Sequence, residues 1–399
     1  MERRRTAVIG GGAAGFFAAI NLKEMLPEME VTIFEQGEKV LRKVSVSGGG
    51  RCNCTNSFED VSDLSQVYPR GHRLLKRLFK VFNHQDAYQW FENHGVELVM
   101  QEDQCVFPKS QNSQTIINTF LYEAKRNDIT IVTGRKITSL DELKDYDYII
   151  LTTGGAPKEK MLEWTENETV SSVPSLFSFN INDTLLQSLT GTVIPNVTAF
   201  IPGTKMRSTG PLLITHWGMS GPAILKLSSY GARYAAECNY KFPLNINWMD
   251  CNEEEAQQMI HEIMIQHPNK KIRSVSVQDI PTRLWTYLTD KCLKERSNYC
   301  WKDLNKKEIN RLTNQLCNDN YMVEGRAVFK EEFVTCGGIA LTAINPSTLE
   351  SKTIPNLYFA GEVLDIDGIT GGFNFQAAWT TAYNVAHSIA VKEQNTLFA

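Results

Sequence analysis

The chain has 399 residues, of which 42% are hydrophobic and 22% charged, and its formal net charge is −4 with a pI near 6.0. This length exceeds one ordinary core and predicts two or three domains, and the slightly acidic balance gives no electrostatic footprint for nucleic acid. Nine cysteines, an odd number without a CxxC pair, fit reduced thiols better than a disulfide framework.

No apolar run approaches the length of a membrane span, and the residues before position 6 contain no signal-peptide core. We therefore expect a cytoplasmic protein that acts on a small-molecule substrate without a membrane or nucleic-acid partner. These features do not indicate an oligomeric state.

A strand, a glycine turn and a helix follow one another near the amino terminus. Residues 6–9 are a short apolar run, and the sequence GGGAAG of residues 10–15 leads into an Ala-, Phe- and Leu-rich helical pattern. Gly10 suits a tight turn, Gly12 lets the backbone approach a pyrophosphate, and Gly15 allows the helix to pack closely on the strand. The pattern predicts dinucleotide binding.

The second predicted strand, residues 31–34, ends on Glu35, twenty residues beyond Gly15. A carboxylate at this position accepts hydrogen bonds from a ribose diol and repels a 2′-phosphate. The ligand expected from this spacing is an adenine dinucleotide without that phosphate, and the motif alone does not separate FAD from NAD.

Residues 37–57 are polar and rich in glycine, and we expect them to form neither regular helix nor strand. Ser47 and the three glycines after it offer backbone N–H donors, while Lys43 and Arg51 add cations suited to phosphate or a flavin carbonyl. A solvated loop without a ligand is an equally good interpretation of the composition alone. Cys52 and Cys54 are too close for a CxxC redox pair and are interpreted as small loop residues.

Helices are then expected at residues 74–82 and 87–94, the second closed by Gly95. Ser113 is expected to cap a helix with apolar residues at 116, 117, 120, 121 and 124, and strands are expected at residues 96–100, 129–133 and 148–152. The last of these strands leads into Thr153, Gly154 and Gly155. The carboxyl end of a central strand binds ligands in dinucleotide domains, although a plain turn fits these three residues equally well.

Residues 179–248 consist of short extended pieces broken by Gly and Pro, which predicts a small β-rich domain. Within it, Ser220 is expected to cap a helix that has Pro222 in its first turn. His216, just upstream, is a candidate catalytic acid or base, although a lone histidine is more often structural. The pattern of residues 252–320 predicts a helical insertion whose first helix is capped by Asn252, and no group of catalytic residues is recognised in it.

The carboxyl-terminal region contains a buried-type strand at residues 357–360, followed by Gly361 and Glu362, and an apolar helix that begins at Gly371 and Gly372. The free N–H groups and positive dipole of such a helix start suit the isoalloxazine edge that becomes negative on reduction. Glu362 is placed to hold ribityl hydroxyls.

Five separated motifs occur in order: KVSVSGGGRCNCTN, VFPKS, TTGG, GPLLITHWGMSGPAIL and LYFAGEVLDIDGITGGFNFQAAW. Together they resemble the bacterial flavoprotein family labelled YhiN or BaiN-like, also called the aminoacetone oxidase family, over residues 6–390. The resemblance implies bound FAD, a Rossmann-type FAD domain made from both chain ends, and an inserted β-barrel-like domain that itself contains a helical domain. A typical member has SSG where this chain has residues 380–382, and Phe373 and Phe375 replace more usual Tyr and Leu, which leaves the choice of substrate open.

We therefore predict an α/β chain with a Rossmann-type FAD-binding domain (1–178 and 336–399), a β-rich inserted domain (179–251 and 321–335) and a helical domain (252–320). The expected activity is hydride transfer between flavin N5 and a small organic substrate, with NAD(P)H as a candidate transient donor. The alternatives are a FAD-dependent amine oxidase that uses O2 and a non-catalytic flavin-binding redox or interaction protein. No second GxGxxG follows a strand, which argues against a separate nicotinamide domain.

No metal ligand is expected. His216 is the one residue with an expected catalytic role, and the other predicted site residues are all expected to bind FAD. They are Gly10, Gly12, Ala13, Ala14, Gly15, Glu35, Gln36, Lys43, Ser47, Gly48, Gly49, Gly50, Arg51, Thr153, Gly154, Gly155, Gly361, Glu362, Asp365, Gly371, Gly372, Phe373 and Asn374.

Overall fold

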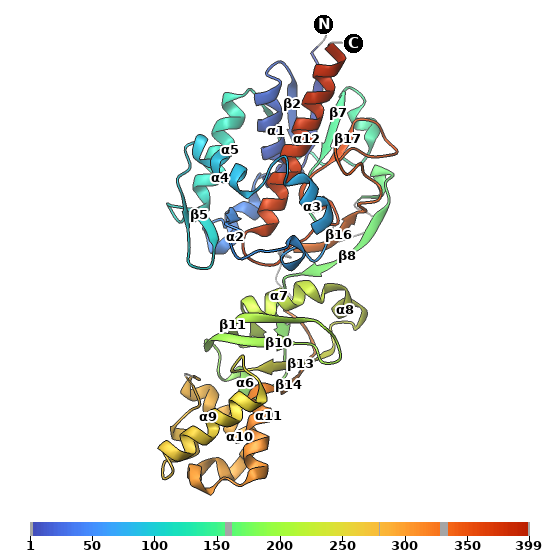
Figure 1. Cartoon of the computed structure of the whole chain (residues 1–399). Coiled ribbons are helices and arrows are strands. Elements are labelled where there is room, and N and C mark those ends of the chain that lie inside the picture. The colour runs from blue at the N-terminus through green and yellow to red at the C-terminus, as the bar shows by residue number, and fades with distance from the viewer. Residues whose placement is uncertain (1–2, 156–161, 279, 328–333, 398–399) are drawn as a thin grey trace. The chain divides into compact units, whose positions relative to one another are not determined.

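The computed structural model describes residues 3–155, 162–278, 280–327 and 334–397 of the chain. The chain divides into two compact units, which can be followed by colour in Figure 1. Unit 1 comprises Met1–Pro174 and Val334–Ala399, and unit 2 is the insertion Ser175–Phe333. The finer division into three domains stays a prediction.

Unit 1 is built on a parallel sheet of five strands in the order β17-β7-β1-β2-β6. These strands are β1 (Arg5–Ile9), β2 (Glu30–Phe34), β6 (Thr130–Val132), β7 (Tyr148–Leu151) and β17 (Leu357–Phe359). The order reverses between β1 and β7, and ligands of open parallel sheets bind outside the carboxyl ends of the strands at such a point. Both chain ends supply strands to this sheet, so the predicted Rossmann-type fold is confirmed.

Among its described residues, smaller sheets and six α-helices complete unit 1. The additional strands are β3 (Thr55–Asn56), β4 (Leu98–Met100) and β5 (Cys105–Pro108) in one sheet, and β8 (Thr169–Ser175) with β16 (Val334–Ile339) in another. The helices are α1 (Ala13–Met25), α2 (Arg42–Gly50), α3 (His72–Leu78), α4 (His84–Asn93), α5 (Ser113–Arg126) and α12 (Phe373–Leu397). Helices α1 and α12 pack together, with the rings of Phe17 and Trp379 5.1 Å apart.

Two details of unit 1 differ from the sequence expectation. Within residues 37–57, where neither helix nor strand was expected, residues 42–46 are helical and Thr55–Asn56 form strand β3, which pairs with β5. The glycine-rich character begins only at Gly48, where Gly48 and Gly49 take left-handed conformations and break α2. The cap of α5 is Asn112, whose side chain accepts from the N–H of Gln114, and Ser113 is already the first helical residue. Its hydroxyl instead donates to the carbonyl of Ser45 at 2.9 Å.

Unit 2 contains an antiparallel sheet of seven strands in the order β14-β13-β10-β11-β12-β9-β15. The strands are β9 (Phe179–Asn180), β10 (Val193–Phe200), β11 (Arg207–Thr215), β12 (Gly218–Ser220), β13 (Phe242–Asn247), β14 (Asp319–Val323) and β15 (Gly325–Arg326). The helices are α6 (Thr184–Gln187), α7 (Pro222–Tyr230), α8 (Ala232–Glu237), α9 (Glu253–Gln266), α10 (Thr282–Leu293) and α11 (Lys306–Cys317).

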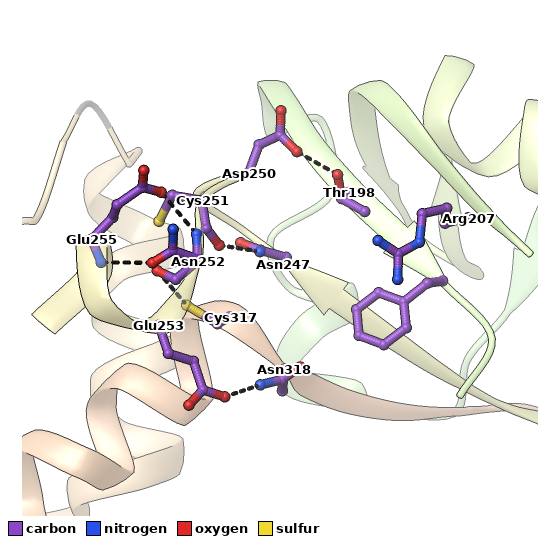
Figure 2. A pocket seen from close by; sticks show the side chains of 11 residues that line it. Thr198, Arg207, Asn247, Asp250, Cys251, Asn252, Glu253, Glu255, Cys317 and Asn318 are labelled. Carbon is purple, nitrogen blue, oxygen red and sulfur yellow. Dashed lines mark hydrogen bonds between the residues drawn. The ribbon is translucent and has the colours of Figure 1, made fainter. Parts of the chain in front are cut away.

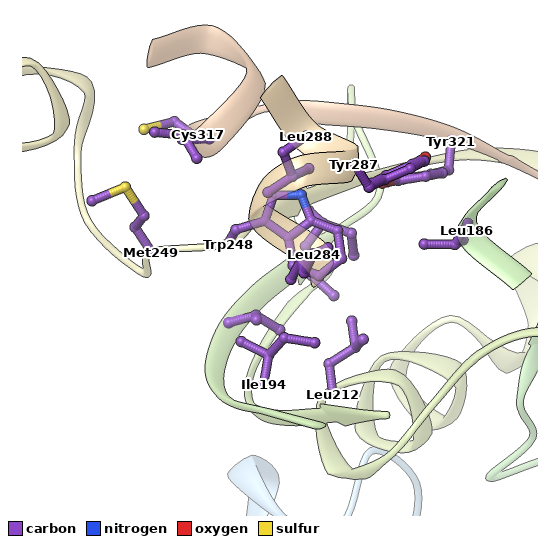
Figure 3. Close-up of a cluster of buried hydrophobic side chains, with 14 of the residues drawn as sticks. Leu186, Ile194, Leu212, Trp248, Met249, Leu284, Tyr287, Leu288, Cys317 and Tyr321 are labelled. Atoms are coloured by element: carbon purple, nitrogen blue, oxygen red, sulfur yellow. The ribbon is translucent and has the colours of Figure 1, made fainter. Parts of the chain in front are cut away.

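One hydrophobic core extends from the sheet of unit 2 into its helices. Figure 3 shows Ile194 and Leu212 of the sheet close to Trp248, Leu284 and Leu288, all of which are buried. The sheet and the helices of unit 2 therefore share one core, and the burial of apolar area in that core holds them together.

Helix starts in unit 2 follow the expectation at one position and differ at another. Asn252 caps α9 and accepts from the N–H of Glu255 at 2.9 Å, as predicted. Helix α7 has Gly221 as its N-cap without a side-chain cap, because Ser220 is still paired in β12. Among the described helices, none is both long and apolar enough to cross a bilayer.

Candidate functional site

The turn between β1 and α1 combines crowded glycines with an open one. A Cβ on Gly10 would lie 2.4 Å from the carbonyl oxygen of Thr152, and one on Gly15 would lie 2.0 Å from that of Gly10. A Cβ on Gly12 would meet nothing within 4 Å, and α1 has neither a side-chain cap nor an acidic residue in its first turn. Close backbone packing, free space and an uncapped helix start fit the pyrophosphate of a dinucleotide. Ala13 and Ala14 belong to this helix start.

Glu35 lies at the end of β2 beside the same turn. Its Oε2 atom accepts from the N–H of Gly11 at 2.9 Å, and its Oε1 atom accepts from the N–H of Gly37 at 2.8 Å. Each carboxylate oxygen has a second lone pair, so the group can still accept from the two hydroxyls of a ribose. Gln36 is exposed and no contact assigns it a role, so its place in the site stays a prediction.

The carboxyl-terminal motif meets the amino-terminal one at Gly361. A Cβ on Gly361 would lie 2.7 Å from the Cβ of Ala14 in the first turn of α1. This approach requires the glycine, whose φ is +77°, and it brings the residues after β17 to the helix start that faces the predicted pyrophosphate.

Glu362 joins three segments that are far apart in the sequence. Its Oε2 atom pairs with Nζ of Lys43 at 2.8 Å, and its Oε1 atom accepts from the N–H of Thr335, also at 2.8 Å. A Cβ on Gly155 would lie 2.8 Å from the same Oε1 atom, and Gly154 is adjacent. The structure therefore gathers Lys43, Gly154, Gly155 and Glu362, and the Lys43 charge is balanced by a carboxylate. Thr153 is exposed at the end of β7.

The glycine segment of α2 presents open backbone. Cβ atoms on Gly49 and Gly50 would meet nothing within 4 Å, which leaves space for a ligand. Ser47 donates to the carbonyl of Val44. Arg51 lies over the ring of Phe107, 4.2 Å from its centroid, and hydrogen-bonds to Gly48 and Gln111, so its guanidinium is positioned by the protein.

The start of α12 is closely packed. A Cβ on Gly372 would lie 2.2 Å from the carbonyl oxygen of Thr55, and one on Gly371 would touch the ring of Phe373 at 2.7 Å. The Asn374 side chain exchanges two hydrogen bonds with the backbone of Gly368, at 2.8 and 2.9 Å. Phe373 is buried against Phe58, so the side chains of Phe373 and Asn374 shape the loop before the helix.

Sequence reasoning missed the ion pair that holds this loop. The guanidinium of Arg70 binds both carboxylate oxygens of Asp367, and the two side chains are 15% and 0% exposed. Burial lowers the pKa of Arg70, but the Asp367 carboxylate outweighs this and raises it overall. No local pattern signals a pair separated by 297 residues. Asp365, two residues earlier, donates its backbone N–H to the carbonyl of Ile339.

Cys52 and Cys54 lie beneath the same region. Both are fully buried, and their Sγ atoms are 3.9 Å apart. Burial is the main cause that raises the pKa of the Cys54 thiol well above its usual value, and the Cys54 carbonyl accepts from the indole N–H of Trp379. Both properties favour the structural interpretation of these cysteines.

His216 belongs to unit 2, where it lies in the turn between β11 and β12. It is exposed, its ring contacts that of Trp217 at 4.2 Å, and its nitrogens form no hydrogen bond with the part of the chain that the structure describes. Its catalytic role stays a prediction.

A separate pocket of about 500 Å³ opens in unit 2, where β10, β11 and β13 meet the start of α9 (Figure 2). Figure 2 shows the hydrogen bonds from Thr198 to Asp250 and from Asn318 to Glu253. Arg207 lies across the pocket from Glu253. The sequence offers no signal for this pocket, because four separated segments line it.

One group of possible metal ligands occurs among the described residues. Ligand atoms of Glu24, His94 and Glu123 lie within 4.8 Å of one another. His94 is already bonded to Glu24 at 2.8 Å and to the carbonyl of Trp90 at 2.7 Å, and Arg126 pairs with Glu123 at 3.2 Å. These contacts form a charged network that links α1, α4 and α5.

Comparisons with known proteins cover almost the whole chain. A sequence model described as the HI0933-like protein Rossmann domain matches residues 4–388. A ribosomal RNA dihydrouridine synthase of Escherichia coli (strain K12) is 27% identical over 98% of this chain and 98% of its own. A protein of the same name from Haemophilus influenzae is 26% identical, over 96% and 98%. A 3-dehydro-bile acid delta(4,6)-reductase of Clostridium scindens is 25% identical, over 97% and 99%.

Proposed function

The chain belongs to the HI0933-like family, and from that membership we propose that it reduces a carbon–carbon double bond conjugated with a carbonyl group. The sequence-based identification of this family and of a FAD-dependent oxidoreductase is confirmed. The type of bond, the substrate and the electron donor are the parts that we propose.

The observation that carries the proposal is a bond type shared by relatives with different names. A dihydrouridine synthase must saturate the C5–C6 double bond of uracil, which is conjugated with the C4 carbonyl. A 3-dehydro-bile acid delta(4,6)-reductase acts on double bonds conjugated with a 3-oxo group. In both, the carbon far from the carbonyl is electron-poor and accepts a hydride, and the neighbouring carbon then takes a proton. One flavin site can serve both reactions.

We propose a uridine of ribosomal RNA as the substrate, because two full-length relatives carry that name. This departs from the expectation of no nucleic-acid partner, which relied on the net charge of the whole chain. A net charge of −4 is a sum over all residues and does not describe one surface.

The described residues suit both the adenosine end and the flavin end of an FAD molecule. We propose that the open N–H groups at residues 12–15 bind the pyrophosphate, that Glu35 binds the adenosine ribose, and that the Lys43–Glu362 pair orients the ribityl chain. When bound, FAD supplies hydride transfer at N5. The N–H of Gly372 is bonded to the Asn53 amide, so we propose that the dipole of α12, and not this N–H group, stabilises negative charge at the flavin edge by about 1 kcal/mol.

His216 is proposed to supply the proton. Its support is chemical: the ring is exposed, it makes no hydrogen bond with described residues, and an imidazole can both donate and accept a proton. General acid catalysis of this kind contributes about 10²- to 10⁴-fold. The variant His216→Ala should lower turnover while FAD content and reduction by dithionite remain unchanged.

The proposed function is tested with purified FAD-loaded protein, NADH or NADPH, and two substrates. One is an unmodified transcript of ribosomal RNA, digested afterwards and examined by mass spectrometry for uridines that have gained two hydrogens. The other is a steroid 4,6-dien-3-one, followed by loss of its absorbance. We expect reduction of a specific uridine with NAD(P)H consumed in equal amount.

Two results would contradict the proposal. If neither substrate is reduced while the dithionite-reduced flavin reacts rapidly with O2, the amine oxidase alternative gains support. If the flavin is reduced by neither nicotinamide nor any amine, a non-catalytic binding role is favoured.

A further inference from the structure

Helix α3 presents an uninterrupted basic surface in unit 1. Arg73, Lys76, Arg77 and Lys80 are exposed, whereas Leu74, Leu75 and Leu78 are buried. The four cations are spaced i, i+3, i+4 and i+7, so they lie on one side of the helix and the turn after it. We call these four residues the α3 basic face.

No ion pair among the described residues neutralises the α3 basic face. The sequence contains no Asp or Glu between Asp63 and Asp86, and the four side chains form no ion pair with any residue that the structure describes. Asp63 is close enough for Lys76 to help lower its pKa, after the larger effect of hydrogen bonds from Ser65.

Some cations elsewhere on the surface are paired with a carboxylate. Examples are Lys109 with Glu97 at 2.7 Å and Arg135 with Glu142 at 2.8 Å. A solvated helix face is the ordinary interpretation of a charge run, and such faces usually mix both signs. Four unpaired like charges repel one another and raise the local concentration of anions.

The segment before α3 is attached to the loop that precedes α12. Arg70 binds Asp367, Tyr68 donates its hydroxyl to the carbonyl of Phe373 at 2.8 Å, and Ile369 donates its N–H to the carbonyl of Val67 at 2.9 Å. Along α3 itself, Asn384 of α12 donates to the carbonyl of Leu78 at 3.3 Å. Figure 1 shows α3 beside α12. The α3 basic face is therefore rigidly connected to the loop that carries Gly371 and Gly372.

We propose that the α3 basic face binds the phosphate backbone of RNA and positions its chain at the edge of the flavin site. The proposal rests on the proposed function, in which RNA is the substrate. The four charges span about 10 Å along the helix, a length that matches two or three successive phosphates of a single strand. Backbone contacts of this type position a nucleic acid without reading its sequence.

The experiment compares two variants of the FAD-loaded protein that lose the same charge. The test variant carries Arg73→Gln, Lys76→Gln, Arg77→Gln and Lys80→Gln. The control variant carries Lys270→Gln, Lys302→Gln, Lys306→Gln and Lys307→Gln, which are exposed residues of unit 2 that form no ion pair among the described residues. Binding of fluorescein-labelled oligouridylate is measured by anisotropy at several salt concentrations.

We expect the test variant to bind at least about tenfold more weakly at low salt, with the slope of log affinity against log salt reduced by about 0.7 for each lost phosphate contact. Its FAD content and the reduction of its flavin by dithionite should equal those of the unaltered protein. The control variant should bind RNA normally. Equal loss in both variants, or no binding of oligouridylate by the unaltered protein, overturns the proposal, as does binding only to vesicles of anionic lipid.

The two proposals fail in different ways. If the unaltered protein reduces uridine and the test variant keeps the same KM for the transcript, the α3 surface is wrong and the proposed function stands. If the α3 face binds oligouridylate but no transcript is reduced, the surface stands and the proposed function is wrong.

Discussion

Helices α1 and α12 both begin at glycines, yet the two glycine turns differ in what surrounds them. Before α1, a Cβ on Gly12 would meet nothing within 4 Å. Before α12, a Cβ on Gly372 would lie 2.2 Å from the carbonyl of Thr55, and the Asn53 amide, with its oxygen toward Gly372, accepts that residue's N–H at 3.2 Å. The first turn leaves space for a ligand, while the second uses its glycine to let two backbone segments touch.

A glycine at a helix start therefore has two separate uses. One use is access, because a missing side chain exposes N–H groups to an anion. The other is packing, because a missing side chain allows backbone to approach backbone. At the start of α1, the open surroundings of Gly12 fit the first use, which stays a proposal, and the close backbone contacts of Gly10 and Gly15 are an example of the second.

Substitutions at Gly15 and Gly12 should give the largest difference between the packing role and the ligand-access role of a glycine. A side chain in Gly15→Val would overlap the carbonyl of Gly10, where a Cβ already lies 2.0 Å away, so α1 cannot pack on β1. We expect a loss of more than about 4 kcal/mol, seen as insoluble or FAD-free protein. Gly12→Ala should fold normally and bind FAD about tenfold more weakly, because its methyl group enters the ligand space. Thermal unfolding and FAD content measure both effects, and normal FAD content in Gly15→Val would contradict the comparison.

The closed turn before α12 can be tested through the ion pair that holds its loop. Asp367→Ala leaves the Arg70 guanidinium, which is only 15% exposed, without its carboxylate. We expect a loss of about 3 kcal/mol, the low end for a buried pair because some exposure remains. Urea unfolding gives the value. The control Glu97→Ala removes the partner of the exposed Lys109 and should not measurably change the free energy of unfolding. Equal losses in both variants would show that the buried pair stabilises the fold no more than an exposed pair does.

The binding role of the open turn is tested at Glu35. Glu35→Ala removes an acceptor for ribose hydroxyls and should weaken FAD binding tenfold or more, equivalent to about 1.5–3 kcal/mol for charge-assisted hydrogen bonds. Rebinding of FAD to the apo-protein, followed by flavin fluorescence, measures the affinity. Glu38→Ala, at a nearby exposed position, is the matched control. Equal affinities of the two variants would remove Glu35 from the ribose site.

The smallest expected effect lies at the end of α1 far from its glycine turn. Burial lowers the pKa of His94, but the hydrogen bonds with Glu24 and with the Trp90 carbonyl, together with the charges of Glu24 and Glu123, outweigh this and raise it overall. A raised pKa in the folded state stabilises the protein below the unfolded value of about 6.5, and this stabilisation disappears as pH rises through the folded pKa. Glu24→Gln should therefore lower the stability by less than about 1 kcal/mol at pH 6 and by less still at pH 9.

Thermal unfolding at both pH values tests the Glu24 prediction. The control His261→Gln alters an exposed histidine whose Nδ1 atom hydrogen-bonds with the Gln257 carbonyl of its own helix, and it should show no such pH dependence. If the stability difference between the unaltered protein and Glu24→Gln is the same at both pH values, the charged form of His94 is not the stabilising one.

Local chemistry in the sequence was sufficient for many elements of the fold. The glycine spacing after β1, the acidic residue at the end of β2 and the Asn252 cap were all predictable, because each depends on residues only a few positions apart. The same reasoning was wrong for residues 42–46, since polar composition does not exclude a short helix before a glycine break.

Motifs of contiguous residues therefore encode the Rossmann-type framework and the family, and FAD follows from the family and not from the dinucleotide motif alone. Only the tertiary structure decided that Lys43 pairs with Glu362, 319 residues away, that Asp367 binds Arg70, and that a glycine before α12 is closed where one before α1 is open. These contacts join segments from opposite ends of the chain. Their partners are selected by how the sheet and helices pack, and no spacing within the sequence records that choice.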